Sequence, residues 1–416
     1  MGYLVVAGGN PLSGRVGIEG AKNAALPACV ASLLTDRPVI LHRVPQLRDV
    51  STILFTIAEL GKRVTRNGPD VMISGEGPLS AEANPYSVRQ MRASFLVLGP
   101  LLARLGRAVV PLPGGCSLGA RPIDLHLRGL EALGARVEEG RTAVTVTASG
   151  LRGRRVELPF PSVGATEQLL MAGSLAKGET EIANGAIEPE VIDLVALLRK
   201  MGCEIELDGR TYRIRGRDEL HGAEHTLIPD RMEAGTLLLA GAITGGEVAV
   251  DGVVPGHLAA FLEILSASEA KVGEGDDRIS VSSSGPPSPV EVETAPYPGF
   301  PTDLHPPLAA YLSLGRGTSR VTETIFERRF TYVAGLRAMG ARISVDRRTG
   351  SITGVKGLHS SSVEAPDIRA GAALLLAGLV ARGETRISGV EQIDRGYAAI
   401  EEKLNRLGAR VERQGD

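Results

Sequence analysis

A loop rich in glycine and proline carries the residue best suited to chemistry, Cys116. The segment 113–119 reads Pro-Gly-Gly-Cys-Ser-Leu-Gly, and turn formers at this density exclude a helix or a central strand and leave the backbone unusual freedom. Arg121-Pro122-Ile123-Asp124 follows, and its proline predicts the start of a helix that continues from Leu125 to Leu133. A helix start offers free N–H groups to an anion. A thiol and a guanidinium beside it indicate chemistry on a phosphorylated substrate, although a lone cysteine is also common as a small buried hydrophobe.

The composition indicates a two-domain protein of the reducing cytoplasm. The chain has 416 residues, 43% of them hydrophobic, which is too long for one ordinary core. A net charge of −2 without a polybasic run excludes nucleic acid and anionic membranes as partners, and no apolar run approaches the roughly 20 residues that span a bilayer. The cysteines at 29, 116 and 203 form no C-x-x-C pair, which argues against a disulfide framework and a zinc site. We expect neither a metal nor a cofactor.

An internal repeat organises the chain. A Leu-Gly-Ala-like turn between an apolar helix end and a β-branched strand recurs with its glycine at positions 61, 134, 202, 340 and 408. Neighbouring glycines lie 73, 68 and 68 residues apart, and the 138-residue gap from Gly202 to Gly340 holds a degenerate copy at 267–272. We therefore predict six repeats of about 70 residues. Each repeat is expected to form a strand, a buried helix, a strand, an exposed helix, the turn and a strand.

The first turn of each predicted buried helix carries a polar residue. Helix starts expose unpaired N–H groups and a positive dipole end, so they favour anions and disfavour basic side chains. Most of these residues are nevertheless basic, which indicates a convergent anion site, whereas Ser162 and Asp303 also suit an ordinary N-cap. The residues lie 66 to 72 positions apart, at Lys22, Arg92, Ser162, Arg231, Asp303 and Arg369.

Several further motifs extend over almost the whole chain. They lie at 20–27, 91–94, 161–166, 229–231, 300–303, 322–327, 367–370 and 393–397. Together with the Cys116 loop they resemble the UDP-N-acetylglucosamine 1-carboxyvinyltransferases of the enolpyruvyl transferase family. This resemblance implies an α/β fold of the EPSP synthase-like type, a two-lobed inside-out α/β barrel with three repeats in each lobe. The first lobe would then comprise residues 1–21 and 229–416, and the second lobe residues 22–228 with the Cys116 loop.

The resemblance also implies a reaction. The family transfers the enolpyruvyl group of phosphoenolpyruvate to the 3-hydroxyl of UDP-N-acetylglucosamine and releases phosphate, which is the first committed step of peptidoglycan synthesis and so serves cell-wall biogenesis, cell shape and cell division. Addition followed by elimination needs an acid, a base and cations for phosphate and carboxylate. By resemblance, Cys116 is the general acid, forms an adduct with phosphoenolpyruvate and is alkylated by fosfomycin, while Asp303 is the base or proton acceptor. Lys22, Arg121 and Arg395 hold the phosphate and carboxylate, and Lys22 and Arg395 complete the catalytic set.

The family pattern further predicts the residues that bind substrates. Some members carry a lysine where this sequence has Phe160, which leaves the diphosphate contact there open, although the backbone of 162–164 still suits it. Arg92 and Arg369 are additional cations. The predicted substrate-binding set is Lys22, Asn23, Arg92, Arg121, Pro122, Ile123, Asp124, Leu125, Phe160, Ser162, Val163, Gly164, Asp303, Ile325, Asp367, Arg369 and Arg395.

Other functions stay compatible with parts of the sequence. An enolpyruvyl transferase that acts on another nucleotide or on shikimate 3-phosphate shares the fold, but the shikimate enzymes are not expected to carry the cysteine loop. A cysteine hydrolase that pairs Cys116 with His126 has no family motif here. A repeat scaffold without enzymatic activity does not explain the polar helix starts. The sequence does not give the oligomeric state, and we expect a monomer or a weak oligomer.

Overall fold

The computed structural model describes residues 2–114 and 123–415. The predicted roles of Cys116, Arg121 and Pro122 therefore lie outside the described residues. Backbone contacts divide the described chain into two compact units. The central unit contains residues 20–114 and 123–228, and the terminal unit contains residues 2–19 and 229–415.

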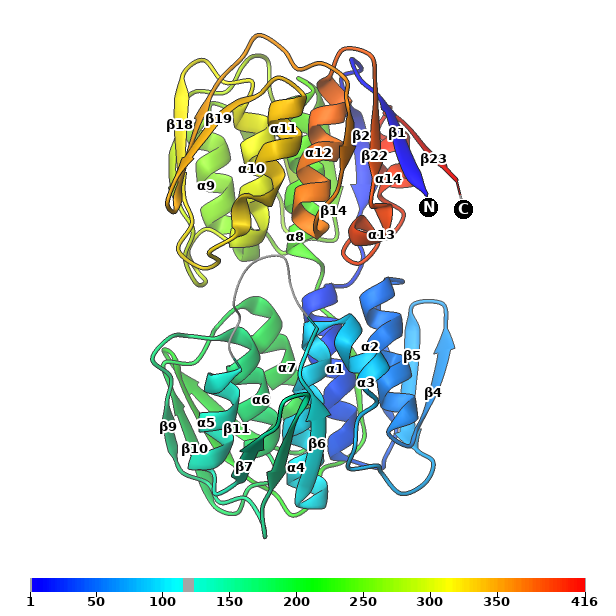
Figure 1. Ribbon diagram of the computed structural model, residues 1–416, viewed down its shortest axis with the longest axis vertical. Coiled ribbons are helices and arrows are strands. Elements are labelled where there is room, and N and C mark those ends of the chain that lie inside the picture. The colour runs from blue at the N-terminus through cyan, green and yellow to red at the C-terminus, as the bar shows by residue number, and fades with distance from the viewer. Residues whose placement is uncertain (1, 115–122, 416) are drawn as a thin grey trace. The chain divides into compact units, whose positions relative to one another are not determined.

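The central unit, drawn in blue to green in Figure 1, alternates helices with short strands. Its described helices are α1 (Lys22–Ala31), η1 (Ser32–Leu34), α2 (Arg48–Glu59), α3 (Pro85–Gln90), η2 (Arg92–Val97), α4 (Leu98–Leu105), α5 (Asp124–Ala132), α6 (Val163–Gly173) and α7 (Pro189–Lys200). Its described strands are β3 (Val39–His42), β4 (Lys62–Asn67), β5 (Asp70–Gly75), β6 (Arg107–Pro111), β7 (Arg136–Glu139), β8 (Ala143–Thr147), β9 (Arg155–Glu157), β10 (Glu179–Ala183), β11 (Glu204–Asp208), β12 (Thr211–Arg215) and β13 (Ala223–Thr226).

The terminal unit has the same alternation and includes both ends of the chain. Its described helices are α8 (Arg231–Ile243), η3 (Pro255–Leu258), α9 (Ala259–Ala267), η4 (Thr302–Leu304), α10 (His305–Leu312), η5 (Arg329–Tyr332), α11 (Val333–Ala338), α12 (Ile368–Val380), α13 (Val390–Ile393) and α14 (Ile400–Arg406). Its described strands are β1 (Tyr3–Ala7), β2 (Ser13–Gly17), β14 (Glu247–Asp251), β15 (Lys271–Glu274), β16 (Arg278–Ser282), β17 (Glu291–Glu293), β18 (Thr318–Thr322), β19 (Arg342–Asp346), β20 (Thr349–Thr353), β21 (Ser362–Glu364), β22 (Glu384–Ser388) and β23 (Arg410–Gln414).

The sheets share one plan. The described residues form five four-stranded sheets and one three-stranded sheet, an arrangement consistent with six repeats. In the sheet ordered β11-β12-β10-β9, β9 and β10 run parallel, and β12 pairs antiparallel with both β10 and β11. The expected repeat lacked a strand equivalent to β12. This strand is the second strand of a hairpin. In it the buried Tyr212 and Ile214 alternate with exposed arginines, a pattern typical of a half-buried strand. That alternation could have predicted β12, which the turn motif alone does not mark.

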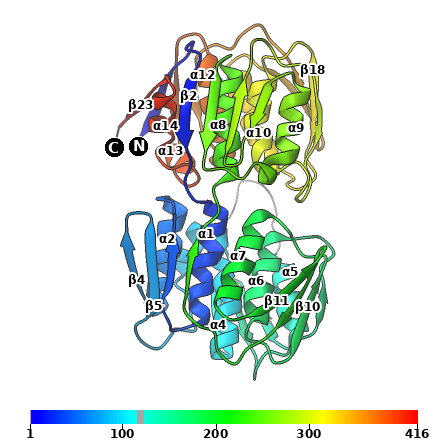
Figure 2. The same cartoon turned by 180° about the vertical axis from the view of Figure 1, so that it is seen from behind.

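Strands from distant parts of the sequence complete two sheets of the terminal unit. β1 pairs antiparallel with both β22 and β23, which places the first strand within the sheet formed by the end of the chain. β2 pairs parallel with β14, and Figure 2 shows the blue β2 beside the green segments of this unit. Residues 2–19 therefore belong to the terminal unit, because the backbone groups of β1 and β2 are paired there.

The glycines of the repeated turn have left-handed backbone conformations. The φ angles are 97° at Gly134, 96° at Gly202 and 95° at Gly340. A side chain makes this conformation unfavourable, which explains the glycine in the repeat. In the degenerate copy, Glu269 has a φ of 70° and so keeps a left-handed turn without glycine.

Buried helices rich in alanine, glycine and leucine form the core of each unit. All 13 residues of α8 are buried, and α8, α10 and α12 pack against one another. In Figure 1 these helices lie between the sheets of the terminal unit. A Cβ atom at Gly241 would lie 2.7 Å from the side chain of Val248, so glycine lets α8 approach β14 closely. The polar groups at the starts of these helices are therefore held by a rigid framework.

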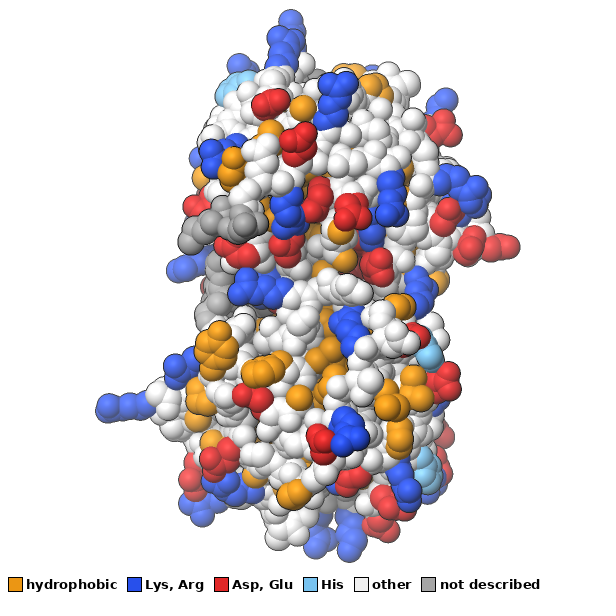
Figure 3. Space-filling view, turned by 90° about the vertical axis from the view of Figure 1, so that its right-hand side faces the viewer, with side chains coloured by type: hydrophobic (Ala, Val, Ile, Leu, Met, Phe, Trp, Pro, Cys, Tyr) orange, Lys and Arg blue, Asp and Glu red, His pale blue; other side chains and the backbone are white. Residues whose placement is uncertain are grey.

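The surface carries both signs of charge. On the face shown in Figure 3, lysine and arginine side chains alternate with aspartate and glutamate, in agreement with the net charge of −2. Within the described ranges, no helix is both long and apolar enough to cross a bilayer.

Candidate active site

Three helix starts in the central unit carry the residues predicted there. Lys22 is the first residue of α1, and Arg92 is the first residue of η2. Ser162 is the N-cap of α6, and its hydroxyl accepts a hydrogen bond from the backbone N–H of Ala165 at 3.4 Å. Ser162 thus acts as an ordinary cap, whereas Lys22 and Arg92 place positive charge at the positive end of a helix dipole.

Lys22 is almost completely buried and lies beside a carboxylate of the same unit. Its exposed fraction is 8%, and Nζ lies 3.5 Å from Oδ2 of Asp49, which is in the first turn of α2. The neighbouring Asn23 is exposed. A buried ammonium needs compensating groups, and the carboxylate of Asp49 provides one.

The start of α6 contacts a buried histidine. A Cβ atom at Gly164 would lie 3.1 Å from the ring of His126, whose other side packs edge-on against Phe95 with ring centroids 5.7 Å apart. Burial, and secondarily the charge of Arg92, lowers the pKa of His126 to about 4. His126 is therefore neutral at pH 7. The pairing with Cys116 that the hydrolase alternative requires involves a residue outside the described ranges.

The remaining predicted residues of the central unit lie near helix starts or on the surface. Ile123 is the N-cap residue of α5, Asp124 is its first residue, and Leu125 follows, each of them partly buried. Phe160 is 43% exposed, and its carbonyl accepts a hydrogen bond from the N–H of Ser162 at 2.7 Å. The structure thus leaves the phenyl ring of Phe160 at the surface, without a cationic side chain at this position.

In the terminal unit, aspartates cap α8 and α12. Asp230 accepts hydrogen bonds from two backbone N–H groups of α8 at 2.8 and 3.0 Å, and Asp367 accepts two from α12 at 2.9 and 3.0 Å. Arg231 and Arg369 follow these caps within the first turn. The negative charge of each capping aspartate offsets the repulsion between the basic residue and the positive end of the helix dipole. The spacing of the basic residues alone did not predict these caps.

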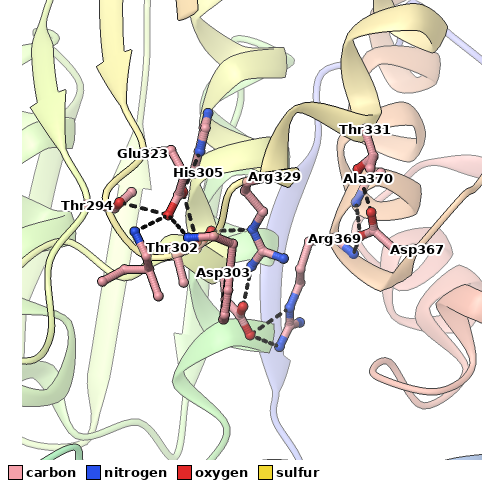
Figure 4. A network of polar contacts seen from close by, with 12 residues as sticks. Thr294, Thr302, Asp303, His305, Glu323, Arg329, Thr331, Asp367, Arg369 and Ala370 are labelled. Carbon is pink, nitrogen blue, oxygen red and sulfur yellow. Dashed lines mark hydrogen bonds and ion pairs between the residues drawn. The ribbon is translucent and has the colours of Figure 1, made fainter. Parts of the chain in front are cut away.

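Asp303 has a different role. It lies inside η4, whose N-cap is Pro301, and the N-cap of the following α10 is Leu304, so the N-cap interpretation of Asp303 is wrong. Its carboxylate instead forms ion pairs with two guanidinium groups, as Figure 4 shows. Arg369 donates from Nε and Nη2 to Oδ2 at 3.0 and 2.8 Å, and Arg329 donates from Nη2 to Oδ1.

Both arginines are buried, while their carboxylate partner is accessible. The exposed fractions are 1% for Arg329 and 4% for Arg369, whereas the side chain of Asp303 is 25% exposed. Burial lowers the pKa of Arg369, but Asp303, Tyr397 and Asp230 together outweigh burial, and the net pKa is raised. The guanidinium of Arg369 also lies 5.3 Å from the ring centroid of Tyr397. Sequence reasoning missed Arg329, which closely follows the predicted motif at 322–327 and begins the short η5, but does not begin one of the predicted buried helices.

Arg395 and Ile325 lie at turns of the terminal unit. Arg395 follows α13, is partly buried, and donates from Nη1 to Oε1 of Gln392 at 3.0 Å. The backbone N–H of Ile325 donates to Oε1 of Glu323 at 2.9 Å. Asp303 and Arg369 are thus in direct contact, and Asp367 lies in the same helix turn as Arg369. No group of three potential metal-binding side chains occurs in residues 2–114 and 123–415.

The sequence and the fold match a known class of enzymes. The family model of EPSP synthase (3-phosphoshikimate 1-carboxyvinyltransferase) matches residues 6–404, and the chain belongs to this family. Among solved structures, the enolpyruvyl transferase NikO from Streptomyces tendae has a TM-score of 0.90 at 26% identity and covers 99% of this chain and 98% of its own. EPSP synthase from Acinetobacter baumannii, at 20% identity and a TM-score of 0.77, shares the fold. The predicted EPSP synthase-like fold class is confirmed.

Curated relatives narrow the class. UDP-N-acetylglucosamine 1-carboxyvinyltransferase 2 of Carboxydothermus hydrogenoformans is 49% identical over 419 residues and covers 100% of both chains. UDP-N-acetylglucosamine 1-carboxyvinyltransferase 1 of Staphylococcus aureus is 46% identical over 421 residues, again with 100% of both chains covered. The resemblance to this enzyme group that the motifs indicated is therefore confirmed.

Proposed function

We propose that this protein transfers the enolpyruvyl group of phosphoenolpyruvate to the 3-hydroxyl of UDP-N-acetylglucosamine and releases phosphate, the first committed step of peptidoglycan synthesis. The observation that carries this proposal is full-length identity of 45 to 49% to enzymes named for that reaction. The EPSP synthase from Acinetobacter baumannii is only 20% identical, so its likeness supports the fold and not shikimate 3-phosphate as the acceptor.

The chemistry assigns a task to each polar group. The 3-hydroxyl oxygen bonds to C2 of phosphoenolpyruvate while C3 takes up a proton; the intermediate then loses phosphate and a C3 proton, which restores the double bond. In this proposal Cys116 supplies the first proton and Asp303 accepts the hydroxyl proton. Oδ2 of Asp303 accepts two hydrogen bonds from Arg369 and Oδ1 accepts one from Arg329, and the side chain of Asp303 is 25% exposed. A hydroxyl group can therefore reach it.

Cations hold the phosphate and carboxylate groups. We assign this role to Lys22, Arg121 and Arg395, with Arg92 and Arg369 as further cations. Arg369 Nη1 is buried and has no hydrogen-bond partner among the described residues. Because a buried guanidinium N–H without a partner is costly, an anionic substrate group that accepts from it would be stabilised.

The sugar nucleotide is assigned to residues near the helix starts. We propose that Asn23, the run 121–125, the run 160–164, Asp303, Ile325 and Asp367 contact it. The N–H groups at the start of α6 offer a diphosphate site that does not depend on a cation at Phe160.

We also propose the cellular compartment, the kind of partner and the oligomeric state. Buried, free Cys29 and Cys203 support a reducing cytoplasm. The mixed surface charge supports small-molecule substrates rather than nucleic acid as partners. We propose a monomer or a weak oligomer, which light scattering across a range of protein concentrations tests.

The decisive experiment measures released phosphate. The protein is mixed with phosphoenolpyruvate alone, with UDP-N-acetylglucosamine added, or with shikimate 3-phosphate added. We expect phosphate only with UDP-N-acetylglucosamine, together with a product heavier than the sugar nucleotide by the enolpyruvyl group. Phosphate that appears only with shikimate 3-phosphate would refute the proposed acceptor.

A further inference from the structure

We infer that Glu323, His305 and Tyr332 form a buried positioning chain that sets the two predicted substrate segments of the terminal unit, 302–304 and 325–326. This inference rests on the proposed function, because it concerns how Asp303 and Ile325 are held. Glu323, His305 and Tyr332 each have an exposed fraction of 0%, and none of them belongs to the predicted site. They are positioning residues because they act through other groups.

One oxygen of Glu323 fixes the turn after β18. Oε1 accepts hydrogen bonds from the backbone N–H groups of Ile325 and Phe326 at 2.9 and 3.0 Å. The hydroxyl of Thr294 donates to the same oxygen at 3.0 Å. Three donors converge on a single oxygen, so the backbone of 325–326 cannot turn away without leaving a buried carboxylate short of partners.

The second oxygen of Glu323 fixes the segment that carries Asp303. Oε2 accepts from the hydroxyl of Thr302 at 2.8 Å and from Nδ1 of His305 at 3.0 Å. On the far side of the ring, Nε2 of His305 lies 2.8 Å from the hydroxyl of Tyr332. A single carboxylate therefore joins the start of α10 to the turn after β18, as Figure 4 shows.

The partners define the direction of each hydrogen bond. Burial raises the pKa of Glu323, but hydrogen bonds from His305 and other donors outweigh burial, and the net pKa is lowered. Burial lowers the pKa of His305 and raises that of Tyr332. Glu323 is then a carboxylate, His305 is neutral with its proton on Nδ1, and the hydroxyl of Tyr332 donates to Nε2.

The chain reaches Asp303 through Arg329. Arg329 donates from Nε to the carbonyl of Thr302 at 3.0 Å and from Nη2 to Asp303. The guanidinium of Arg329 also lies 5.4 Å from the ring centroid of Phe326. Glu323 accepts hydrogen bonds from both Thr302 and Phe326. Both residues contact the guanidinium of Arg329, so Glu323 positions the arginine that orients the carboxylate of Asp303.

The kinetic test uses substitutions that keep side-chain volume. Glu323→Gln replaces one acceptor oxygen by an NH₂ donor, and Tyr332→Phe removes the terminal hydroxyl. We expect kcat to fall about tenfold or more and the KM for UDP-N-acetylglucosamine to rise in both, since small displacements of reacting groups are costly. The KM for phosphoenolpyruvate should change less, because the segments that Glu323 joins, 302–304 and 325–326, carry Asp303 and Ile325, which we assign to the sugar nucleotide.

Tyr311→Phe is the matched control. Tyr311 is also buried in the terminal unit, at 1% exposure, and its hydroxyl lies 3.1 Å from that of Ser268. It should lose comparable stability in urea and keep wild-type kinetics. Wild-type kinetics in Glu323→Gln, or equal kinetic losses in Tyr311→Phe, would overturn the inference.

A spectroscopic readout separates this inference from the proposed function. In ¹⁵N-histidine NMR, the signals that disappear in His305→Gln should show a protonated Nδ1 and an unprotonated Nε2 in the wild type. Glu323→Gln should reverse this tautomer, because the amide NH₂ then donates to Nδ1. A doubly protonated ring, or a tautomer that Glu323→Gln leaves unchanged, would refute the chain. Wild-type protein that releases no phosphate would instead refute the proposed function, and the tautomer would still decide the hydrogen-bond chain.

Discussion

Arg369 donates through both Nε and Nη2 to the same carboxylate oxygen of Asp303, at 3.0 and 2.8 Å. The two residues are 66 positions apart in the sequence, about one repeat. Arg369 lies in the first turn of α12, and Asp303 lies in η4, directly before the buried helix α10. Successive repeats have therefore placed opposite charges in contact. The pair combines an accessible carboxylate with a guanidinium fixed in the core.

Loss of this two-point contact is expected to impair turnover. Arg369→Lys keeps the charge but cannot donate through two nitrogens, so we predict a loss of about 1.5 to 3 kcal/mol, or roughly 10- to 100-fold in kcat/KM. Phosphate release measures the effect. Arg278→Lys is the control, because Arg278 pairs with Asp251 at the surface and should tolerate the change. Equal activity of the two variants would contradict the assignment.

Removing the charge of Asp303 should affect both stability and activity. Asp303→Asn leaves the buried guanidinium groups of Arg329 and Arg369 without their carboxylate, so we predict a loss of about 3 kcal/mol in the free energy of unfolding. The proton acceptor is lost as well, and turnover should become undetectable. Urea denaturation and phosphate release measure the two effects. A variant that is destabilised but turns over normally would show that Asp303 has only a structural role.

The buried His126 predicts a loss of stability in mild acid. Its pKa is about 4 in the folded protein, because burial disfavours the charged ring, against about 6.5 in the unfolded chain. Its contribution is thus complete above pH 6.5 and falls as the pH drops toward 4, by about 2 kcal/mol between pH 8 and pH 5. His126→Gln should flatten urea stability over this range by that amount. His359→Gln, at an exposed position, should leave the slope as in the wild type.

Fosfomycin should modify a single cysteine. Burial raises the pKa of Cys29 to about 12 and also raises that of Cys203, so neither supplies a thiolate at neutral pH. We predict one added inhibitor mass at Cys116, formed by opening of the epoxide, together with loss of phosphate release. Mass spectrometry of digested protein locates it. Cys116→Asp should stay unlabelled, and label on that variant would identify a different target.

Part of this arrangement was predictable from the sequence. Lys22 and Arg92 begin buried helices as the repeat predicted, because helix starts leave local signals in spacing and residue type. The family was recognisable because its motifs are long and ordered. The hairpin strand β12 was missed because the turn motif marks only the strand before it.

The contacts that orient the site were not predictable in the same way. The carboxylate of Glu323 receives donors from Thr294, Thr302 and His305, which lie 18 to 29 residues earlier in the chain. Such hydrogen bonds depend on how strands and helices pack, and neither spacing nor residue type marks them beforehand. Arg329 was missed for the same reason, since its partner Asp303 comes from another element.

Glu269 occupies the position in the repeated turn that is glycine in the other copies. It keeps the left-handed φ of 70° where sister copies have glycine, and its side chain pairs with Ser288 and Arg316. The left-handed turn is thus kept without the glycine of the other copies, at a residue whose side chain is held by two partners. In this chain the positive φ angle therefore marks the repeated turn even in the copy that lacks the glycine.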